Sequence, residues 1–453
     1  MVGRSFHAAL GLAVLVACSQ HSAQDSEQPS GDPPTGNDQV PENGGTDGGT
    51  TPDAPTTPDA PTTPDAPATP DAPGTPVAAC PVGIAAFTHA IGLANPDQRS
   101  DIAVDAAGNV LFATAAPAGT TGNANGVTKL SPSGDVLLTL PFGSVVATDA
   151  AGNFYVAGAF SAPLDVGLGV MQPEGNVDVF VAKFDSAGKP VFAQPLRLCG
   201  DGVTSIAVDA TGRIAVSGTA LGTVVLSPTG ALQFTVAVSG DVAFNSHGVL
   251  IIGGSAVAGT DLGDGPVLAG DVTSAGFLLA VDGNGQRVFS HVFPGKETVL
   301  VNSVAVDSAD NIVFTGFYTL SIVLFGDEYR AQFAQESGRF TGGFSAKLDP
   351  NGAVIWKHGT GTTELNGIAV DVAGNVILTG ASTGNAGFNR ITDVQKLGPT
   401  GASLSITEMF PATGYGRGFS VATDACGSIY LSAVAVDSFA PRVTSAYVVK
   451  LTK

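Results

Sequence analysis

The chain has 453 residues, of which 60 are Gly, 44% are apolar and only 13% are charged, and its formal net charge is −20. With 19 Lys and Arg residues against 39 Asp and Glu, it lacks the basic surface that a phosphate backbone requires, which argues against nucleic-acid binding. The low charge content also argues against a coiled coil or a long exposed helix. Abundant Gly with Val, Ala, Thr and Phe favours many short strands joined by tight turns.

Residues 1–18, MVGRSFHAALGLAVLVAC, have the pattern of an export signal. One cation precedes an apolar run that is too short to remain as a membrane-spanning helix. The run ends in LVAC, which resembles a bacterial lipobox. This resemblance implies that Cys18 is lipidated and holds the mature protein at the outer membrane or cell surface, since Ser19 is not the Asp that often marks inner-membrane retention. The alternative is an ordinary secretory signal with a chance cysteine.

Residues 19–79 have the composition of a disordered tether. They contain ten acidic residues and no Lys or Arg, so they carry half of the net charge, and the unit TTPDAP recurs four times between Thr50 and Pro73 with small changes. Such a segment buries too little apolar surface to offset its conformational entropy. Proline at every third position favours polyproline II, in which 24 residues reach about 75 Å. We expect a spacer before a folded part that spans residues 80–453.

The folded part contains a sevenfold repeat. Its first pattern is apolar-Ala-Val-Asp-x-x-Gly-Asn-apolar, as in IAVDAAGNVLFAT from Ile102. Asp or Asn opens a tight turn between two strands, and Gly three residues later suits a left-handed conformation. Asp310 replaces this Gly in the fifth unit, which is tolerable because Asp visits that conformation. The seven turn residues are Asp105, Asp149, Asp209, Asn245, Asp307, Asp371 and Asp424.

A second pattern, apolar-Lys-Leu-x-Pro-x-Gly followed by another strand, comes after the first, as in AKLDPNGAVIW from Ala346. Each repeat therefore has four strands, which is typical of β-propeller blades. The last repeat ends after its third strand, while GIAAFTHAIG from Gly83 resembles the fourth strands of other repeats. An N-terminal strand that completes the last blade closes the ring and removes open sheet edges. We predict an all-β, seven-bladed β-propeller closed in this way, with six or eight blades as the alternative.

The repeat core followed by DVFVAKFDSAGKPVFAQ, from Asp178, resembles the bacterial seven-bladed propeller repeat family often labelled SBBP. The resemblance covers residues 80–453 and is weaker in blades 3 and 4, where Val225 and Ala280 replace the lysine of the third strand. Related repeats occur in exported and lipid-anchored proteins, notably of myxobacteria. The family has no common catalytic residues, so the resemblance implies no catalytic site.

Cysteine positions fit an exported protein. In the repeat frame, Cys80 and Cys426 fall in turns on the same face of the last blade, so a disulfide between them is geometrically plausible. Cys199 falls on the opposite face, at a connection between blades. The alternative is three buried thiols.

Motifs for chemistry are weak. His89, His291 and His358 occupy the same position in three outermost strands, so they are too far apart to share a metal. Asp261, Asp264 and Asp271 have irregular spacing for calcium. The GxSxG match at 380–384 follows a strand without a following helix, and the glycine pairs at 167/169 and 263/265 lack a βαβ context for a phosphate site. We therefore expect no catalytic residues, metal or cofactor.

Binding is the favoured function. Long connections at 159–177, 255–275 and 317–342 are expected on the face that also carries the blade-to-blade loops, and a protein or glycan ligand is expected there. Arg330, Tyr415 and Arg417 are the candidate anchors, because Arg and Tyr often dominate binding energy; the alternative is that they pack the loops. The inner strands begin with Ser100, Ser144, Thr204, Asn302 and Asn366, which are polar but uncharged.

Two functions remain open from the sequence. One is an exported, lipid-anchored binding or scaffold protein that is monomeric. The other is an extracellular propeller enzyme acting on glycans or proteins, which would need a cluster of titratable groups.

Overall fold

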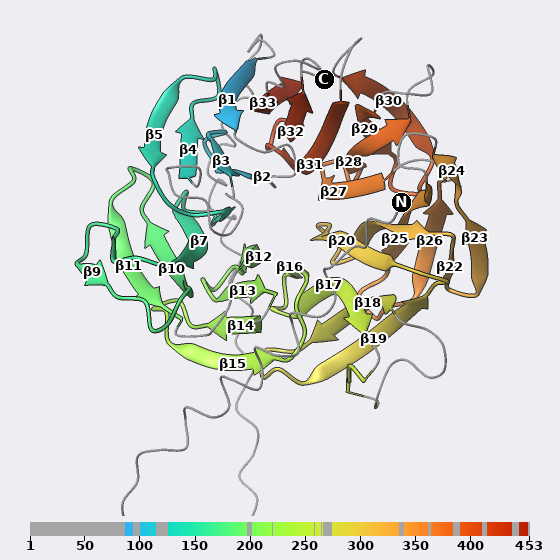
Figure 1. Ribbon diagram of the computed structural model, residues 1–453, viewed down its shortest axis with the longest axis horizontal. Coiled ribbons are helices and arrows are strands. Elements are labelled where there is room, and N and C mark those ends of the chain that lie inside the picture. The colour runs from blue at the N-terminus through green and yellow to red at the C-terminus, as the bar shows by residue number, and fades with distance from the viewer. Residues whose placement is uncertain are drawn as a thin grey trace, which may run out of the picture. The chain divides into compact units, whose positions relative to one another are not determined.

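The structure is a computed structural model that describes residues 87–451, apart from 94–99, 115–125, 197–201, 220, 258, 264, 266–273, 335–338, 361–363, 384–389, 410–414 and 437–443. The described residues form strands β1 to β33 and no helix. Seven sheets surround a common centre, and each has an inner, two middle and an outer strand (Figure 1).

Blades 1 to 4 follow one another along the chain, each as an antiparallel meander from the centre outward. Blade 1 consists of β2 (Ser100–Val104), β3 (Val110–Thr114), β4 (Gly126–Leu130) and β5 (Val136–Leu140). Blade 2 consists of β6 (Val145–Thr148), β7 (Phe154–Phe160), β10 (Asp178–Phe184) and β11 (Pro190–Pro195). Blade 3 consists of β12 (Val203–Val208), β13 (Ile214–Gly218), β14 (Gly222–Leu226) and β15 (Leu232–Val236). Blade 4 consists of β16 (Asp241–Phe244), β17 (Leu250–Val257), β18 (Ser274–Val281) and β19 (Arg287–Pro294).

Blades 5 to 7 continue the series. Blade 5 consists of β20 (Val299–Val306), β21 (Ile312–Thr319), β25 (Arg339–Leu348) and β26 (Val354–Gly359), with β24 (Gln332–Ala334) paired to β25. Blade 6 consists of β27 (Glu364–Val370), β28 (Val376–Thr383), β29 (Arg390–Leu397) and β30 (Ser403–Met409). Blade 7 consists of β31 (Tyr415–Thr423), β32 (Ile429–Val436), β33 (Thr444–Leu451) and β1 (Thr88–Leu93).

Blade 7 takes its outer strand from the N-terminal part of the chain, as predicted. β1 runs antiparallel to β33, with Thr88 opposite Val449 and Leu93 opposite Thr444. Each inner strand contacts the inner strand of the next blade, and β31 of blade 7 contacts β2 of blade 1. The ring therefore has seven blades, and the six- and eight-bladed alternatives are excluded.

The repeated turns between first and second strands have the expected geometry. In blade 1, Asp105 Oδ1 accepts hydrogen bonds from the backbone N–H groups of Ala107 and Asn109, at 3.0 and 2.9 Å. Gly108, three residues after the aspartate, has φ +78°, and Asp310 in blade 5 has φ +62°. We call the face that carries these turns and the turns between third and fourth strands the turn face. The opposite face, which carries the other connections, is the loop face.

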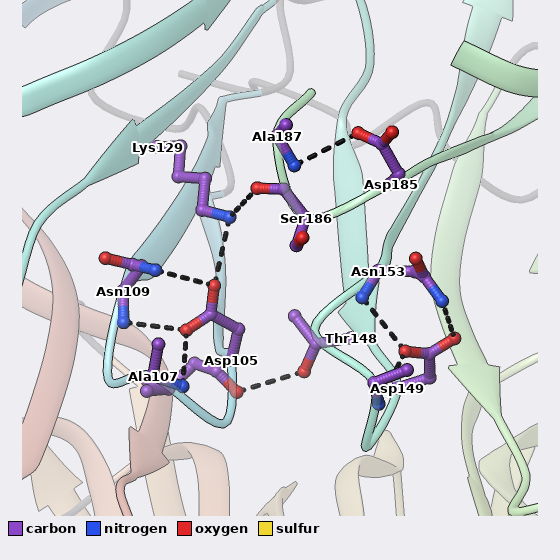
Figure 2. Close-up of polar contacts among 12 residues, drawn as sticks. Asp105, Ala107, Asn109, Lys129, Thr148, Asp149, Asn153, Asp185, Ser186 and Ala187 are labelled. Atoms are coloured by element: carbon purple, nitrogen blue, oxygen red, sulfur yellow. Dashed lines mark hydrogen bonds and ion pairs between the residues drawn. The ribbon is translucent and has the colours of Figure 1, made fainter. Parts of the chain in front are cut away.

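A lysine of the third strand neutralises the turn aspartate and links neighbouring blades. Lys129 Nζ lies 3.0 Å from Asp105 Oδ2 and donates to the carbonyl oxygen of Ser186 in blade 2 (Figure 2). Equivalent ion pairs join Lys183 to Asp149, Lys347 to Asp307 and Lys396 to Asp371. The side chains of the Lys129 and Lys347 pairs are almost fully buried, so each charge depends on its partner.

Blades 3 and 4 lack this lysine, and each compensates differently. In blade 3, Arg213 pairs with Asp209 at 2.6 Å and donates to the carbonyl oxygen of Gly248 in blade 4. In blade 4 the turn residue is the neutral Asn245, so no cation is needed beside it. The register of both blades matches the others, with Val225 opposite Ala215 and Ala280 opposite Ile251.

The connection of blade 5 is folded, whereas the sequence predicted a long loop on the loop face. It forms the hairpin of β22 (Ser321–Leu324) and β23 (Asp327–Arg330), and β22 contacts the outer strand β19 of blade 4. Ile322 and Leu324 are fully buried in the core between blades 4 and 5. Side chains alternate in direction along β22, so Ile322 and Leu324 are buried on one side while Val323 is exposed on the other. Blade 2 carries a shorter hairpin of β8 (Leu164–Asp165) and β9 (Val170–Met171).

Candidate binding site at the loop end of the central strands

The inner strands of blades 5, 6 and 7 each contain a β-bulge close to the loop face. Register shifts leave Asn302 in β20, Asn366 in β27 and Phe419 in β31 without an opposite residue. A bulge redirects the side chain of its extra residue, and bulges are frequent beside functional sites.

The bulge side chains link each inner strand to the next blade. Asn302 Nδ2 donates to the carbonyl oxygen of Leu365 at 2.7 Å, and Asn366 Nδ2 donates to that of Gly418 at 2.9 Å. In blade 3, Thr204 Oγ1 makes the same kind of bond to Gly240. The polar residues that the sequence placed at the starts of inner strands therefore do lie there, and three of them bridge blades.

Arg417 completes this series at the junction of blades 6 and 7. Its Nη2 donates to Asn366 Oδ1 at 3.1 Å and lies 3.6 Å from Glu364 Oε2. The guanidinium lies over the ring of Phe419, 5.2 Å from its centre. Its Nε is buried and has no hydrogen-bond partner, and the fully buried Thr392 of blade 6 also has an unpartnered Oγ1. This junction therefore contains a positively charged group with an unused donor.

Two aspartates that the sequence analysis missed lie further along the inner strands. Asp101 accepts hydrogen bonds from Val146 N of blade 2 and Ser420 Oγ of blade 7. Asp241 accepts them from Ser205 Oγ of blade 3 and Ser303 Oγ of blade 5. The prediction that these strands begin with uncharged polar residues was thus incomplete. The sequence could have indicated these two aspartates as inner-strand residues, because both occupy the repeat position at which three other blades have Ser.

Burial dominates the electrostatics of these two carboxyl groups. It raises the pKa of Asp101 from 3.8 to about 6, with a smaller rise from the negative charge of Asp241, while the backbone N–H donors lower it. Burial likewise raises the pKa of Asp241 above its ordinary value. Both groups bridge three consecutive blades, so their first role is to hold the ring together.

The structure does not bring the three predicted anchors together. Arg417 lies on the inner strand β31, and Tyr415 begins the same strand, although its side chain is outside the described residues. Arg330 ends β23 at the outer edge of the ring, where it is exposed and pairs with Glu328 at 3.2 Å (Figure 1). The site described above therefore includes Arg417 and excludes Arg330.

Tyr318, which the sequence placed in the same long connection, packs the core. It is 1% exposed and donates from its hydroxyl to the carbonyl oxygen of Thr360. Burial raises its pKa to about 12. Tyr318 therefore packs this connection against the core.

Cys426 is disulfide-bonded. Cys18, Cys80 and Cys199 are outside the described residues, so the pairing of Cys426 with Cys80 stays a prediction. The register supports it, because β1 begins at the turn face, as does the turn of Asp424 that contains Cys426.

The three histidines lie in different blades, at the equivalent positions of β1, β19 and β26. His291 Nε2 donates to the carbonyl oxygen of Gly352 at 2.9 Å, and burial lowers its pKa. Among the described residues, no group of three or more His, Cys, Asp or Glu could hold a metal ion.

Asp261 accepts two backbone N–H bonds within its own turn, while Asp264 and Asp271 lie outside the described residues. Ser382 lies within β28 rather than at a strand-to-helix turn.

The sheet topology defines the chain as a seven-bladed β-propeller. Solved structures similar to it include the WD40 repeats of RRP9, with 9% identity, a TM-score of 0.48, and coverage of 81% of this chain and 97% of that one. The structure of U3-55K has 10% identity and a TM-score of 0.47, and the match covers 80% of this chain and 98% of that one. The Dos1 propeller has 12% identity and a TM-score of 0.42, and the match covers 80% of this chain and 93% of that one. No protein-family model and no curated protein matches the chain. In the described part, no helix is long and apolar enough to cross a membrane.

Proposed function

We propose that this protein is an exported, lipid-anchored propeller of the SBBP type, which binds a protein or glycan ligand at the outer membrane or cell surface. The propeller fold supports a binding or scaffold role in general, because its rigid ring presents variable connections on one face. The finer proposal is that the ligand binds at the loop end of the central strands, around Arg417.

The observation that carries this proposal is the unused hydrogen-bonding capacity of Arg417. Asn302 and Asn366 donate their amide N–H groups to backbone carbonyl oxygens. Arg417 Nε, by contrast, has no hydrogen-bond partner, and the Arg417 guanidinium lies 3.6 Å from the carboxylate of Glu364. The side chain is 25% exposed, so a ligand can reach part of the guanidinium, although the unpartnered Nε is itself buried. Arg binds carboxylates with two parallel hydrogen bonds, and these charge-assisted bonds are strong. The ligand class is therefore one with a carboxylate or similar anionic group.

The test is binding of the full chain to arrays of acidic oligosaccharides and acidic peptides. Arg417→Gln should lower the affinity for the selected ligand by about tenfold or more, and Arg417→Lys should restore only part of it because Lys lacks the planar fork. Arg330→Gln is the matched control and should bind like the unmodified chain. Ligands that bind Arg417→Gln unchanged, in a variant with unchanged melting temperature, would overturn the site.

The anchor is supported by the lipobox-like end of the first 18 residues and by the tether that follows it. Cys18→Ala should move the protein from the membrane fraction to the soluble fraction. If that variant stays in the membrane fraction, the lipid anchor at Cys18 is wrong.

A further inference from the structure

The two-residue tips of the described turns on the turn face contain no Lys, Arg, Asp or Glu. This face has seven described turns between first and second strands and six between third and fourth strands. The tips of these turns are pairs such as Ala106–Ala107, Ala150–Ala151 and Pro399–Thr400. This is notable in a chain with a net charge of −20.

The aspartates that open the turns between first and second strands direct their carboxylates into the molecule, whereas Asp185, Asp282 and Asp349, which open turns between third and fourth strands, make exposed hydrogen bonds. Asp371 Oδ1 accepts the backbone N–H groups of Ala373 and Asn375, and its Oδ2 lies 2.9 Å from Lys396 Nζ. Four of the turn aspartates, Asp149, Asp209, Asp307 and Asp371, have pKa values below their ordinary range because such hydrogen bonds and ion pairs outweigh burial. The charges of these four aspartates are thus compensated behind the tips of the turns between first and second strands.

Exposed aliphatic side chains surround the edge of this face. Each outer strand of blades 1 to 6 has a register shift just after it leaves the turn face. At or beside this shift at least one large aliphatic side chain is 47–62% exposed, and these residues include Leu137, Val191, Leu232, Val288, Ile355 and Leu404. Val372, at a turn tip, is 68% exposed. The arrangement repeats in six blades.

The N-terminal segment joins the ring at the same face. β1 begins there, and the carbonyl oxygen of Phe87 accepts a hydrogen bond from Lys450 N at the end of β33. Residues 1–86, which include the proposed lipid anchor, therefore connect to the turn face. A second copy of this chain on the same face would bring together two acidic tethers, each with a charge of −10 from residues 19–79.

We propose that the turn face lies against the surface of a lipid bilayer, with the loop face and Arg417 directed away from it. This proposal rests on the proposed lipid anchor. Uncharged tips lose little hydration energy near lipid headgroups, and exposed aliphatic side chains at the edge gain from partial insertion. A weak second contact of this kind adds to the membrane binding of a lipid chain.

The test is photo-crosslinking of the full lipidated chain in phosphatidylethanolamine–phosphatidylglycerol vesicles. A benzoylphenylalanine replaces Val372 on the turn face or, as the matched control, Val257, which is 62% exposed at the loop end of β17. We expect several-fold more lipid adduct from position 372 than from position 257. The additional change Leu137→Ser with Leu404→Ser should lower the adduct at 372.

Equal adduct yields from the two positions, or more adduct from position 257, overturn the orientation. If the chain still floats with the vesicles in that case, the lipid anchor stands. If the chain with intact Cys18 does not float with the vesicles, both the anchor and the orientation are wrong.

Discussion

Lys450, at the end of the third strand of blade 7, donates a hydrogen bond from Nζ to the carbonyl oxygen of Pro132 in blade 1, at 3.2 Å. The bond corresponds to that of Lys129 with Ser186 between blades 1 and 2. Lys450 therefore joins the last blade to the first in the same way as Lys129 joins blade 1 to blade 2. Ring closure thus uses two devices, this lysine and the pairing of β1 with β33.

Lys450→Met should destabilise the ring by about 1–3 kcal/mol, because it leaves the partly buried carbonyl oxygen of Pro132 without its donor and removes the charge beside Asp424. Urea unfolding measures this change. Lys189→Met, which alters an exposed lysine in a turn of blade 2, is the control and should be nearly neutral. Equal effects of the two substitutions would show that the bond to Pro132 does not stabilise the ring.

Lys347→Met should cost about 3 kcal/mol or more, since it leaves the buried carboxylate of Asp307 unpaired. Adding Asp307→Asn should recover part of that loss, because it copies the neutral combination that blade 4 already has in Asn245 and Ala280. The measurement compares the free energy of unfolding of Lys347→Met with that of the double variant. A double variant that is less stable than Lys347→Met would contradict the charge-compensation explanation.

Stability should depend on pH through Asp101. Its pKa is about 6 in the folded protein and 3.8 as the ordinary value, so the folded state binds the proton more tightly than the unfolded chain. The stabilising contribution is therefore complete below pH 3.8 and is lost as the pH rises through 6, by about 1–3 kcal/mol.

The stability of Asp101→Asn relative to the unmodified chain should accordingly increase as the pH rises from about 4 to about 6.5, and should not change further at higher pH. His291, whose pKa is lowered, acts in the opposite direction in both proteins and cancels in the comparison. Asp135→Asn, at an exposed turn, controls for the loss of a surface charge. A difference between Asp101→Asn and the unmodified chain that does not change with pH would exclude this role of Asp101.

Non-reducing peptide mapping of the full chain should recover Cys426 linked to Cys80. Cys80→Ser and Cys426→Ser should then lower the melting temperature equally, with a loss of about 2–4 kcal/mol of stability. A peptide that links Cys426 to Cys199 would show that the predicted pairing is wrong.

The sequence predicted the blades well because their turns are chemically specific. The aspartate-to-glycine spacing requires a bonded carboxylate and a left-handed backbone, and both occur in blade 1 at Asp105 and Gly108. The closing strand was equally predictable, since only the first strand of the folded part lacked partners in its own repeat. Even Asp310 was anticipated, although its bonds to Ser246 and His247 of blade 4 were not.

The site was harder to predict because it depends on contacts between blades. Asn366 was recognised as an inner-strand residue, but its hydrogen bonds with Gly418 and Arg417 join segments about 50 residues apart. The β-bulge that orients its side chain has no signal in a single sequence. Arg330 was grouped with Arg417 because the long connection of blade 5 and the connection between blades 6 and 7 were expected on the same face. The hairpin of β22 and β23 instead places Arg330 at the outer edge.

Hydrogen–deuterium exchange with and without the ligand selected on the arrays tests most directly whether binding occurs around Arg417. A ligand at this position should slow amide exchange at the loop ends of β27 and β31, with no change in the turns of Asp105, Asp307 and Asp371. Slower exchange confined to those turns, or to the hairpin of β22 and β23, would contradict binding at the loop end of the central strands.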